Sequence, residues 1–574
     1  MVRRYASLAL LTICWGCRIW SSGESKLEQR ADLKPSARAH RDDWDEGRLP
    51  DTPASESPQQ GGEIVVRIHS EPPSLNTLLD SDAVAARITE HRIYESLLSL
   101  DPYDHPRYRL QPELAERWQV SSDGLTYTFW LRRSVKWHDG LPFTARDVIA
   151  TFEKVQDPNT KAMHVRSYTQ DLESFRALDD YAVEFRFKRP YFLVMDGIFA
   201  DVPIQPAHLI AHLSGAQYND AASNPLNRHP IGTGPFRFEA WETNHRIALA
   251  RNREYWRRPP YLDRVVFRII KESSVILELA ARQELDVVTR IRPEQWVRMD
   301  RQLLAPHFHR ALYYGSNYLW VGYNQARSLF RDARVRRAMT MLIDRNGIIN
   351  GLLYGLARPT TCHFYVDSSA CDASLEPPAY DPAQASSLLE QAGWHLSSQD
   401  RVRTRSGQRF VFTLMIPAAA EDSIRMATLA KESMARAGVE MRLQKVEWSA
   451  FVKRLRERDF DACTLLWGSS SPRKDPMQVW HSSSIQGGSN YVGFSSERAD
   501  RLIEVARTEF DEERRNALYR ELGRILYDEQ PYTWLLTRPE LTLVHRRIRG
   551  ARVSLADFRY EDFWVMSEST EAAR

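Results

Sequence analysis

Apolar and polar residues alternate over several short stretches in the first half of the chain, a pattern typical of half-buried β-strands. The predicted strands are residues 63–69, 127–132, 183–188, 236–238 and 246–250. Helical spacing of apolar residues predicts a helix at 83–98. A capping box formed by Thr144 and Asp147 predicts a second helix that runs to residue 155.

In the second half of the chain, stretches with the alternating pattern of strands and stretches with the apolar spacing of helices follow one another repeatedly. Strands are predicted at residues 318–323, 410–416, 439–446, 460–467 and 532–536, and helices at 333–349, 382–392, 423–437, 450–456, 497–507 and 512–528. The regular alternation of strand and helix between 410 and 467 is typical of a doubly wound α/β lobe.

Length and charge narrow the classes of protein. The chain has 574 residues, more than the roughly 250–300 that one hydrophobic core serves, so two or more lobes are expected. Its 78 basic and 75 acidic side chains leave a formal charge of +3, a balance that does not favour nucleic acid as a partner.

The N-terminus has the pattern of an export signal. Two arginines precede an apolar run at residues 5–13, which is too short to span a hydrocarbon core of about 30 Å. A Gly-Cys pair then resembles the end of a lipobox, so we expect residues 1–17 to be a signal peptide and Cys17 to be lipidated. Plain cleavage and an uncleaved anchor are the alternatives. The polar residues 18–61 are predicted to form a disordered tether.

Residues that carry chemistry do not form a recognisable catalytic motif, and the sequence predicts no enzyme, no cofactor and no metal site. His138, in a Trp-His-Asp sequence, is a candidate for catalysis, with a structural turn as the alternative. His208 and His212 could share a helix face as metal ligands or form a surface pair. Cys362 and Cys371 would form either a disulfide or two buried thiols.

Several sequence blocks follow one another in the order of a known protein family. They include LQPELAERW at 110–118, DGLTYTF at 123–129, VKWHDG at 135–140, PFTARDV at 142–148, PIGTGPF at 230–236, RNREYW at 251–256, RVRRA at 334–338 and YVGF at 491–494. With these blocks the chain resembles the family 5 extracellular solute-binding proteins, the oligopeptide, dipeptide and nickel-type binding proteins of ABC importers.

The resemblance implies an α/β fold of the periplasmic-binding-protein type II class, with two lobes joined by hinge strands and a small appended subdomain. Lobe I would comprise residues 62–98, 204–317 and 535–568, the appended subdomain 99–203, and lobe II 318–534. The ligand would be enclosed where the lobes meet, and the importer would read the closed form.

The resemblance also implies ligand-binding residues. They are Asp82, Ala83 and Val84, in the segment that pairs with peptide backbone, and Trp467, Gly468 and Ser470, in the family's Trp-x-x-Asp segment. In the family, the aspartate of that segment holds the α-ammonium group of the peptide. Ser470 stands in its place, and a hydroxyl group does not neutralise a buried ammonium group. Either Asp475 or Asp82 takes this role, or the ligand lacks a free amino terminus.

Further candidates lie around this segment. Arg473 and Lys474 would suit an acidic group of the ligand, or else both point to solvent. The candidate aromatic and polar contacts in the cleft, with core packing as the alternative for each, are Tyr168, Tyr323, Asn324, Trp480 and Tyr491.

The sequence therefore predicts an exported, lipid-anchored and monomeric solute-binding protein that delivers a peptide-like ligand to ABC permease subunits in the membrane. One alternative is the same fold with another ligand, such as a chelated metal, a glycan or a lipid-linked fragment. The others are a ligand sensor that docks on a signalling partner, and an exported hydrolase with an unfamiliar site.

Overall fold

The computed structural model describes residues 47–53, 55–79, 82–105, 107–166, 168–469, 473–554 and 558–566. The larger sheets of this part of the chain have seven, six and four strands. Among the same residues, no helix has the length and apolar character needed to cross a membrane.

The seven-stranded sheet is the basis of what we call lobe I. In spatial order its strands are β12 (Phe308–Tyr314), β22 (Pro539–His545), β11 (Val287–Val288), β1 (Glu63–Ile68), β10 (Arg264–Ile269), β9 (Arg246–Arg251) and β8 (Phe236–Glu242). The helices of this lobe are α2 (Ala83–Thr89), α7 (Ile276–Ala281), α8 (Pro293–Arg298) and α9 (Arg301–Leu304). Strand β1 is buried on both faces, because Val66 enters the core on one face while Val65 packs against the core on the other.

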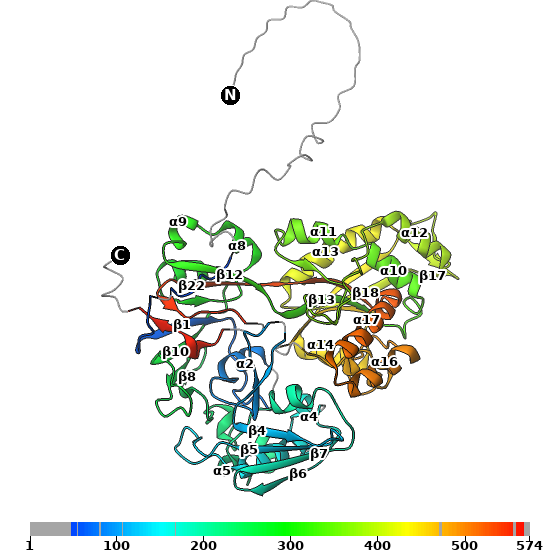
Figure 1. The fold of residues 1–574 in the computed structure, drawn as a ribbon. Coiled ribbons are helices and arrows are strands. Elements are labelled where there is room, and N and C mark those ends of the chain that lie inside the picture. Colours follow the sequence, from blue (N-terminus) through cyan, green and yellow to red (C-terminus); the bar gives the residue numbers. More distant parts are fainter. Residues whose placement is uncertain are drawn as a thin grey trace, which may run out of the picture. The chain divides into compact units, whose positions relative to one another are not determined.

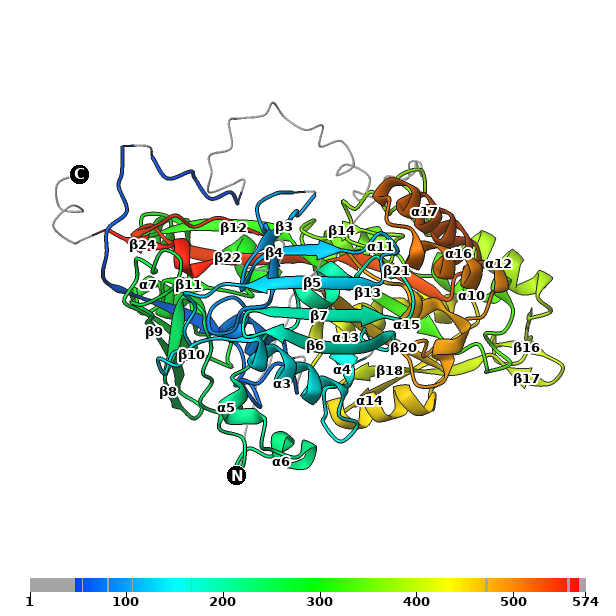
Figure 2. The same ribbon diagram turned by 60° about the horizontal axis from the view of Figure 1, so that its bottom comes forward.

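A four-stranded antiparallel sheet forms the subdomain. Figure 2 shows its strands side by side, in the order β4 (Ala115–Val120), β5 (Thr126–Leu131), β7 (Ala182–Phe187) and β6 (Leu172–Asp179). The other elements of this part of the chain are β2 (Leu98–Leu100), β3 (Leu110–Pro112), α3 (Ala145–Gln156), α4 (Met163–Arg166), the π-helix η1 (Met195–Phe199), α5 (Ala207–Ile210) and α6 (Gly215–Asn219). The predicted capping box is present at the start of α3, where the backbone N–H of Thr144 donates to the Asp147 carboxylate at 2.8 Å.

The six-stranded sheet is the basis of lobe II. Its order is β14 (Arg358–Pro359), β21 (Tyr532–Thr537), β13 (Ser316–Tyr323), β20 (Ala462–Ser469), β18 (Val411–Pro417) and β19 (Glu440–Val446). The longer helices are α10 (Ala333–Met341), α12 (Pro382–Gln391), α13 (Glu421–Arg436), α14 (Trp448–Glu457), α16 (Glu497–Thr508) and α17 (Glu512–Glu529). Shorter elements are α11 (Arg345–Gly347), the π-helix η3 (Ile348–Leu352), α15 (Met477–Trp480) and a hairpin sheet of β15 (His395–Leu396), β16 (Arg403–Arg405) and β17 (Gln408–Arg409).

The chain passes between the two large sheets along paired antiparallel segments. Strands β12 and β13 are separated only by Gly315, and β21 and β22 only by Arg538. β12 pairs with β22 in lobe I, and β13 pairs with β21 in lobe II. These crossings run through the centre of Figure 1 and give the lobes a two-stranded connection.

Two predicted helices are shorter than their apolar spacing indicates. Helix α2 ends at Thr89, because His91 adopts a left-handed backbone conformation (φ 57°), and the apolar residues beyond it are buried without helix. Helix α10 ends at Met341, and Asp344 caps a new turn by accepting a hydrogen bond from the backbone N–H of Gly347 at 2.8 Å.

Part of the predicted tether contacts lobe I. The carboxylate of Glu56 pairs with Arg549 at 2.6 Å, and the hydroxyl of Thr52 accepts a hydrogen bond from the backbone N–H of Gly550 at 2.9 Å. Leu49 of the same segment also packs against the core of lobe I. The segment has no apolar period, so hydropathy does not indicate this association. In lobe II, Cys362 and Cys371 are joined in a disulfide, one of the two states left open for them.

Candidate functional site

One wall of the candidate site is a stack of aromatic rings on lobe II. Strands β13 and β20 are antiparallel, with Tyr318 opposite Trp467, so alternation places Tyr318, Trp320 and Trp467 on one face of the sheet. The ring of Trp467 lies between Trp320 (centroids 6.1 Å apart, 19° between planes) and Tyr491 (6.2 Å, 15°). Trp467 and Tyr491 are only half-buried, so this stack offers ring surface to a ligand.

The segment that follows β20 joins lobe II to the subdomain. The guanidinium of Arg473 binds the Asp196 carboxylate at 2.7 Å and the backbone carbonyl of Arg107 at 2.7 Å. Two residues further on, Asp475 accepts a hydrogen bond from the hydroxyl of Tyr191 at 2.9 Å and pairs with Arg507 at 3.0 Å.

Apolar contact accompanies these charges. Phe192 of the subdomain lies under the guanidinium of Arg515 (4.3 Å) and beside the ring of Tyr519 (6.4 Å). Its backbone N–H donates to the carbonyl of Arg507 at 2.9 Å. The lobe II helices α16 and α17 therefore contact the subdomain directly.

Between Arg473 and Asp475, the side chain of Lys474 takes a different direction. Its Nζ lies 5.7 Å from the centre of the Tyr318 ring, on the same face of lobe II as Trp467. Burial lowers the pKa of Lys474 to about 8. Burial, and to a smaller extent the positive charge of Lys474, lower the pKa of His363. The Nδ1 atom of His363 is 2.7 Å from the hydroxyl of Tyr318.

The opposite wall carries acidic groups at the end of α2 and after η1. The side chain of Asp201 is open to solvent, yet protein surrounds the carboxyl on most sides, and this burial, reinforced by Glu90, raises the pKa of Asp201 to about 7. Burial likewise raises the pKa of Glu90, against the opposing charges of His91 and Arg92. A carboxylate that is both accessible and poorly hydrated is suited to bind a cationic group.

Tyr168 lies between these acidic groups and the segment after β20. Burial raises its pKa to about 12, with further contributions from Asp201 and Asp475. The structure thus places Tyr168 of the subdomain and Trp467, Asp475 and Tyr491 of lobe II around the junction of lobe II with the subdomain.

The two carboxylates offered as substitutes for the missing aspartate are already engaged. Asp82 caps α2 by accepting hydrogen bonds from the backbone N–H groups of Val84 (2.9 Å) and Ala85 (2.8 Å). Asp475 is bound by Arg507 and Tyr191, and its side chain is only 4% exposed. Ser470 lies outside the described residues, as does Cys17.

Some of the remaining candidates are exposed and others are buried in the core. Ala83 is exposed, and a Cβ added to the exposed Gly468 would meet no other atom within 4 Å. Tyr323, Asn324 and Trp480 are buried inside lobe II. The hydroxyl of Tyr323 is 3.0 Å from that of Thr533, and the amide of Asn324 donates to two backbone carbonyls.

Two interpretations of the charged and histidine residues need correction. Arg473 does not point to solvent, because Asp196 binds it. His208 and His212 do not share a helix face, because α5 ends at Ile210; His208 contacts Asp139 instead, at 2.7 Å. No group of three potential metal ligands is arranged around an ion position anywhere in the described ranges.

His138 has a structural role. Its Nε2 is 3.0 Å from the carbonyl of Gly234, and its Nδ1 accepts a hydrogen bond from the backbone N–H of Gly232 at 3.3 Å. An added Cβ at Gly232 would lie 1.8 Å from the carbonyl oxygen of Ile93, so this glycine allows the loop to approach that backbone. The Trp-His-Asp turn therefore fixes the loop before β8.

Asp201 was not anticipated from the sequence. It follows the apolar residues of η1 without any local motif, and it is close to Glu90 only in the folded structure. No signal in a single sequence identifies such a residue.

Comparison with known proteins agrees with this architecture. The family model described as bacterial extracellular solute-binding proteins, family 5 Middle, matches residues 109–489. The oligopeptide-binding protein AppA of Bacillus subtilis is 28% identical over 487 residues, which cover 83% of this chain and 86% of AppA. The dipeptide-binding protein of Escherichia coli is 25% identical over 464 residues, 76% of this chain and 83% of that protein.

Solved structures give the same result for the fold. AppA in complex with a nonapeptide has a TM-score of 0.77 at 26% identity and covers 89% of this chain and all of its own. NikA from Brucella suis, in complex with Fe(III)-EDTA, also has a TM-score of 0.77, but at 22% identity. The predicted fold class, periplasmic-binding-protein type II, is confirmed. The chain belongs to family 5 of the bacterial extracellular solute-binding proteins.

Proposed function

We propose that this protein is an exported solute-binding protein that encloses a peptide-like ligand between its lobes and presents it to the permease of an ABC transporter. The observation that carries the proposal is the match, over most of both chains, to relatives that are named for oligopeptides and dipeptides. The family consists of transport proteins, and an enzymatic reaction forms no part of the proposal.

The geometry of the site supports a ligand with a free amino group. Asp201 offers an accessible carboxylate that no side chain neutralises by a hydrogen bond or ion pair among the described residues. Half-buried Trp467 and Tyr491 offer ring surface that accepts varied side chains. Asp201 would thus take the role that the family gives to the aspartate replaced by Ser470, with main-chain hydrogen bonds supplying affinity along the peptide.

Attachment to the membrane is a separate part of the proposal. A Gly-Cys pair after the apolar run at residues 5–13 supports lipidation of Cys17, and the protein would act as a monomer. Metabolic labelling with a fatty-acid analogue would test the first point, since a Cys17→Ser variant should lose the label while a Cys14→Ser variant keeps it.

Ligand binding is tested most directly by stability. The protein is unfolded once to remove carried ligand, refolded, and its melting temperature is measured with di- to octapeptides in free and N-acetylated form. A ligand at a hundredfold excess over Kd stabilises the native state by about 2.7 kcal/mol, enough for a clear shift.

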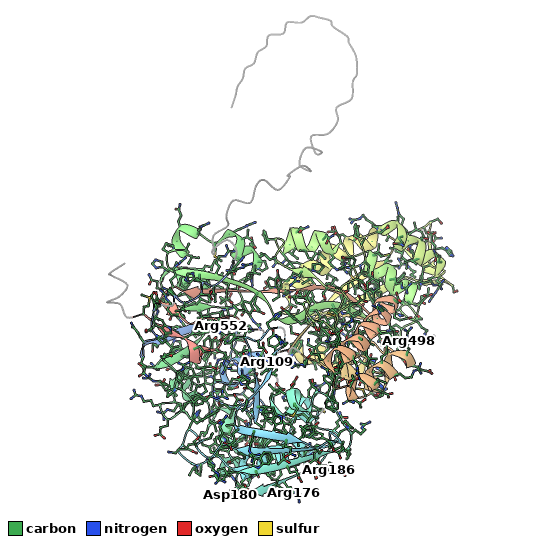
Figure 3. The ribbon with its side chains drawn as sticks, in the orientation of Figure 1. Arg109, Arg176, Asp180, Arg186, Arg498 and Arg552 are labelled. Carbon is green, nitrogen blue, oxygen red and sulfur yellow. A yellow bond between two sulfur atoms is a disulfide. The ribbon has the colours of Figure 1, made fainter. Side chains whose placement is uncertain are left out.

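The matched pair of variants is Asp201→Asn and Asp180→Asn. Asp180 lies at the outer edge of the subdomain (Figure 3), so its replacement should leave the shift intact, whereas Asp201→Asn should abolish the preference for a free amino terminus. If no peptide stabilises the refolded protein, the peptide assignment is wrong and the fold serves another ligand.

A further inference from the structure

The three residues Arg473, Lys474 and Asp475 differ in what their side chains contact. Arg473 binds Asp196, and Asp475 binds Tyr191, so both outer residues contact the subdomain. Lys474 contacts lobe II instead, with its Nζ 5.7 Å from the centre of the Tyr318 ring. The ammonium group is therefore held at the junction of the lobes, beside the face that carries the aromatic stack.

The carboxylates of Asp196 and Asp475, which lie beside this segment or in it, are already paired with arginines. Asp196 is bound by Arg473, and Asp475 is bound by Arg507 and by the hydroxyl of Tyr191. Within the described part of the chain, no carboxylate lies at ion-pair distance from Lys474. Its ammonium group lies over the Tyr318 ring instead.

His363, the histidine nearest to the Tyr318 hydroxyl, adds no positive charge beside Lys474. Burial and the charge of Lys474 both lower the pKa of His363, so the imidazole is neutral, and it faces the hydroxyl of Tyr318 at 2.7 Å. A half-buried ammonium group without a counter-charge is unfavourable, and burial alone lowers its pKa to about 8. A carboxylate brought by a ligand would offset this cost and form a charge-assisted hydrogen bond.

We propose that Lys474 binds a carboxylate group of the ligand at the junction of lobe II and the subdomain. The inference rests on the proposed function and deepens it by fixing one charge of the ligand. Lys474 then gives this chain a cation in the segment where the family carries the aspartate that Ser470 replaces. A peptide can therefore bind here with its two ends placed differently from those of a peptide bound to other members of the family.

The carboxylate can come from the C-terminus of a peptide or from an acidic side chain, and the experiment separates these sources. The tightest-binding member of a series of di- to octapeptides of alanine is titrated calorimetrically, first free and then C-amidated. The amidated peptide is then compared in two forms that carry a single Glu or a single Gln.

The variants are Lys474→Met, Lys474→Arg and the matched control Lys453→Met. Lys453 is an exposed lysine of lobe II, with 73% of its side chain accessible and a distant pairing to Glu457 at 3.9 Å. Lys474→Met should weaken binding of the carboxylate form about tenfold to a hundredfold and leave the matching amide unaffected. Lys474→Arg should retain most of the preference, and the control variant should bind like the wild type.

A second measurement keeps the test independent of folding. Removal of an uncompensated charge should keep or raise the melting temperature of the ligand-free Lys474→Met protein. A preference for the free C-terminus identifies the terminal carboxylate, and a preference for Glu over Gln identifies a side chain.

If peptides bind but neither amidation, nor the Glu-to-Gln exchange, nor Lys474→Met changes Kd, the assignment of Lys474 is wrong while the proposed function stands. If no peptide binds the refolded wild type, the proposed function fails, and the Lys474 inference fails with it.

Discussion

Replacing Arg473 with methionine should weaken ligand binding even though Arg473 is not placed as a ligand contact. Its guanidinium connects lobe II to the subdomain through the Asp196 carboxylate (2.7 Å) and the carbonyl of Arg107 (2.7 Å). These contacts exist only while the two parts touch, so the variant should destabilise the closed form relative to the open one.

The magnitude follows from the burial of the pair. Breaking a fully buried ion pair costs about 3–5 kcal/mol, and an exposed pair contributes about 0–1 kcal/mol. The Arg473 side chain is 20% exposed and that of Asp196 is 8% exposed, which places the loss near 2 kcal/mol after some solvent screening. Burial raises the pKa of Asp196 and Arg473 opposes that rise, so loss of Arg473 would promote protonation of Asp196 and relieve part of the cost. A loss of about 2 kcal/mol in closure corresponds to about a 30-fold increase in Kd.

The assay combines calorimetric titration with small-angle scattering, with and without the peptide ligand. The control is Arg186→Met, which removes an exposed ion pair to Glu173 (2.9 Å) at the outer edge of the subdomain (Figure 3) and should change Kd by less than about twofold. The Asp196→Asn variant completes a double-mutant cycle, in which the two losses should not add. Additive losses, or an Arg473→Met protein that binds as tightly as the wild type, would refute the reasoning.

Further predictions address stability and pH dependence. Cys362→Ser should lower the free energy of unfolding by about 2–3 kcal/mol, because the disulfide to Cys371 closes a loop with a separation of nine residues; denaturant titration checks this value, and reductant should not affect the variant. Asn324→Ala should cost about 2–3 kcal/mol by removing the amide that donates to the carbonyls of Arg458 and Phe460, of which Phe460 keeps a hydrogen bond from Arg327, yet leave Kd unchanged in calorimetric titration. Affinity for peptides with a free amino terminus should fall as the pH decreases through about 7, because the raised pKa of Asp201 lets its carboxylate take up a proton there, whereas Asp201→Asn should show no such dependence in titrations of Kd against pH.

The elements of the fold followed closely from residue periodicity, and their ends did not. The capping box at Thr144 is a local device, so the sequence predicted both the start and the length of α3. The end of α2 depends on the left-handed backbone of His91 and on burial of the following residues without helix, which tertiary packing imposes. Apolar spacing alone continued that helix too far.

Within the site, the sequence indicated candidate aromatic residues but not which of them are buried. Tyr318 and Tyr323 lie five positions apart in β13, so their side chains are on opposite faces. Tyr318 lies on the face with Trp467, and Tyr323 lies in the core with helices α10 and α13. The alternation along β13 shows that Tyr318 and Tyr323 lie on different faces of the sheet. Which of these faces meets the subdomain depends on the packing of α16 and α17, which the strand pattern does not show.

The charges of the candidate site are divided between the subdomain and lobe II, and this division couples closure to the ligand. With the proposed assignments, Asp201 on one wall and Lys474 on the other are each surrounded by protein, and neither has an ion-pair partner among the described residues. Closing around an empty site would remove further water from both groups, which costs free energy. The ion pair between Arg473 and Asp196 offsets this cost only in part. A ligand that carries an ammonium and a carboxylate group removes both costs at once, so the Arg473–Asp196 ion pair then stabilises the closed form. The closed form therefore depends on two ligand charges together, so a peptide blocked at one end should lose more affinity than a single missing hydrogen bond explains.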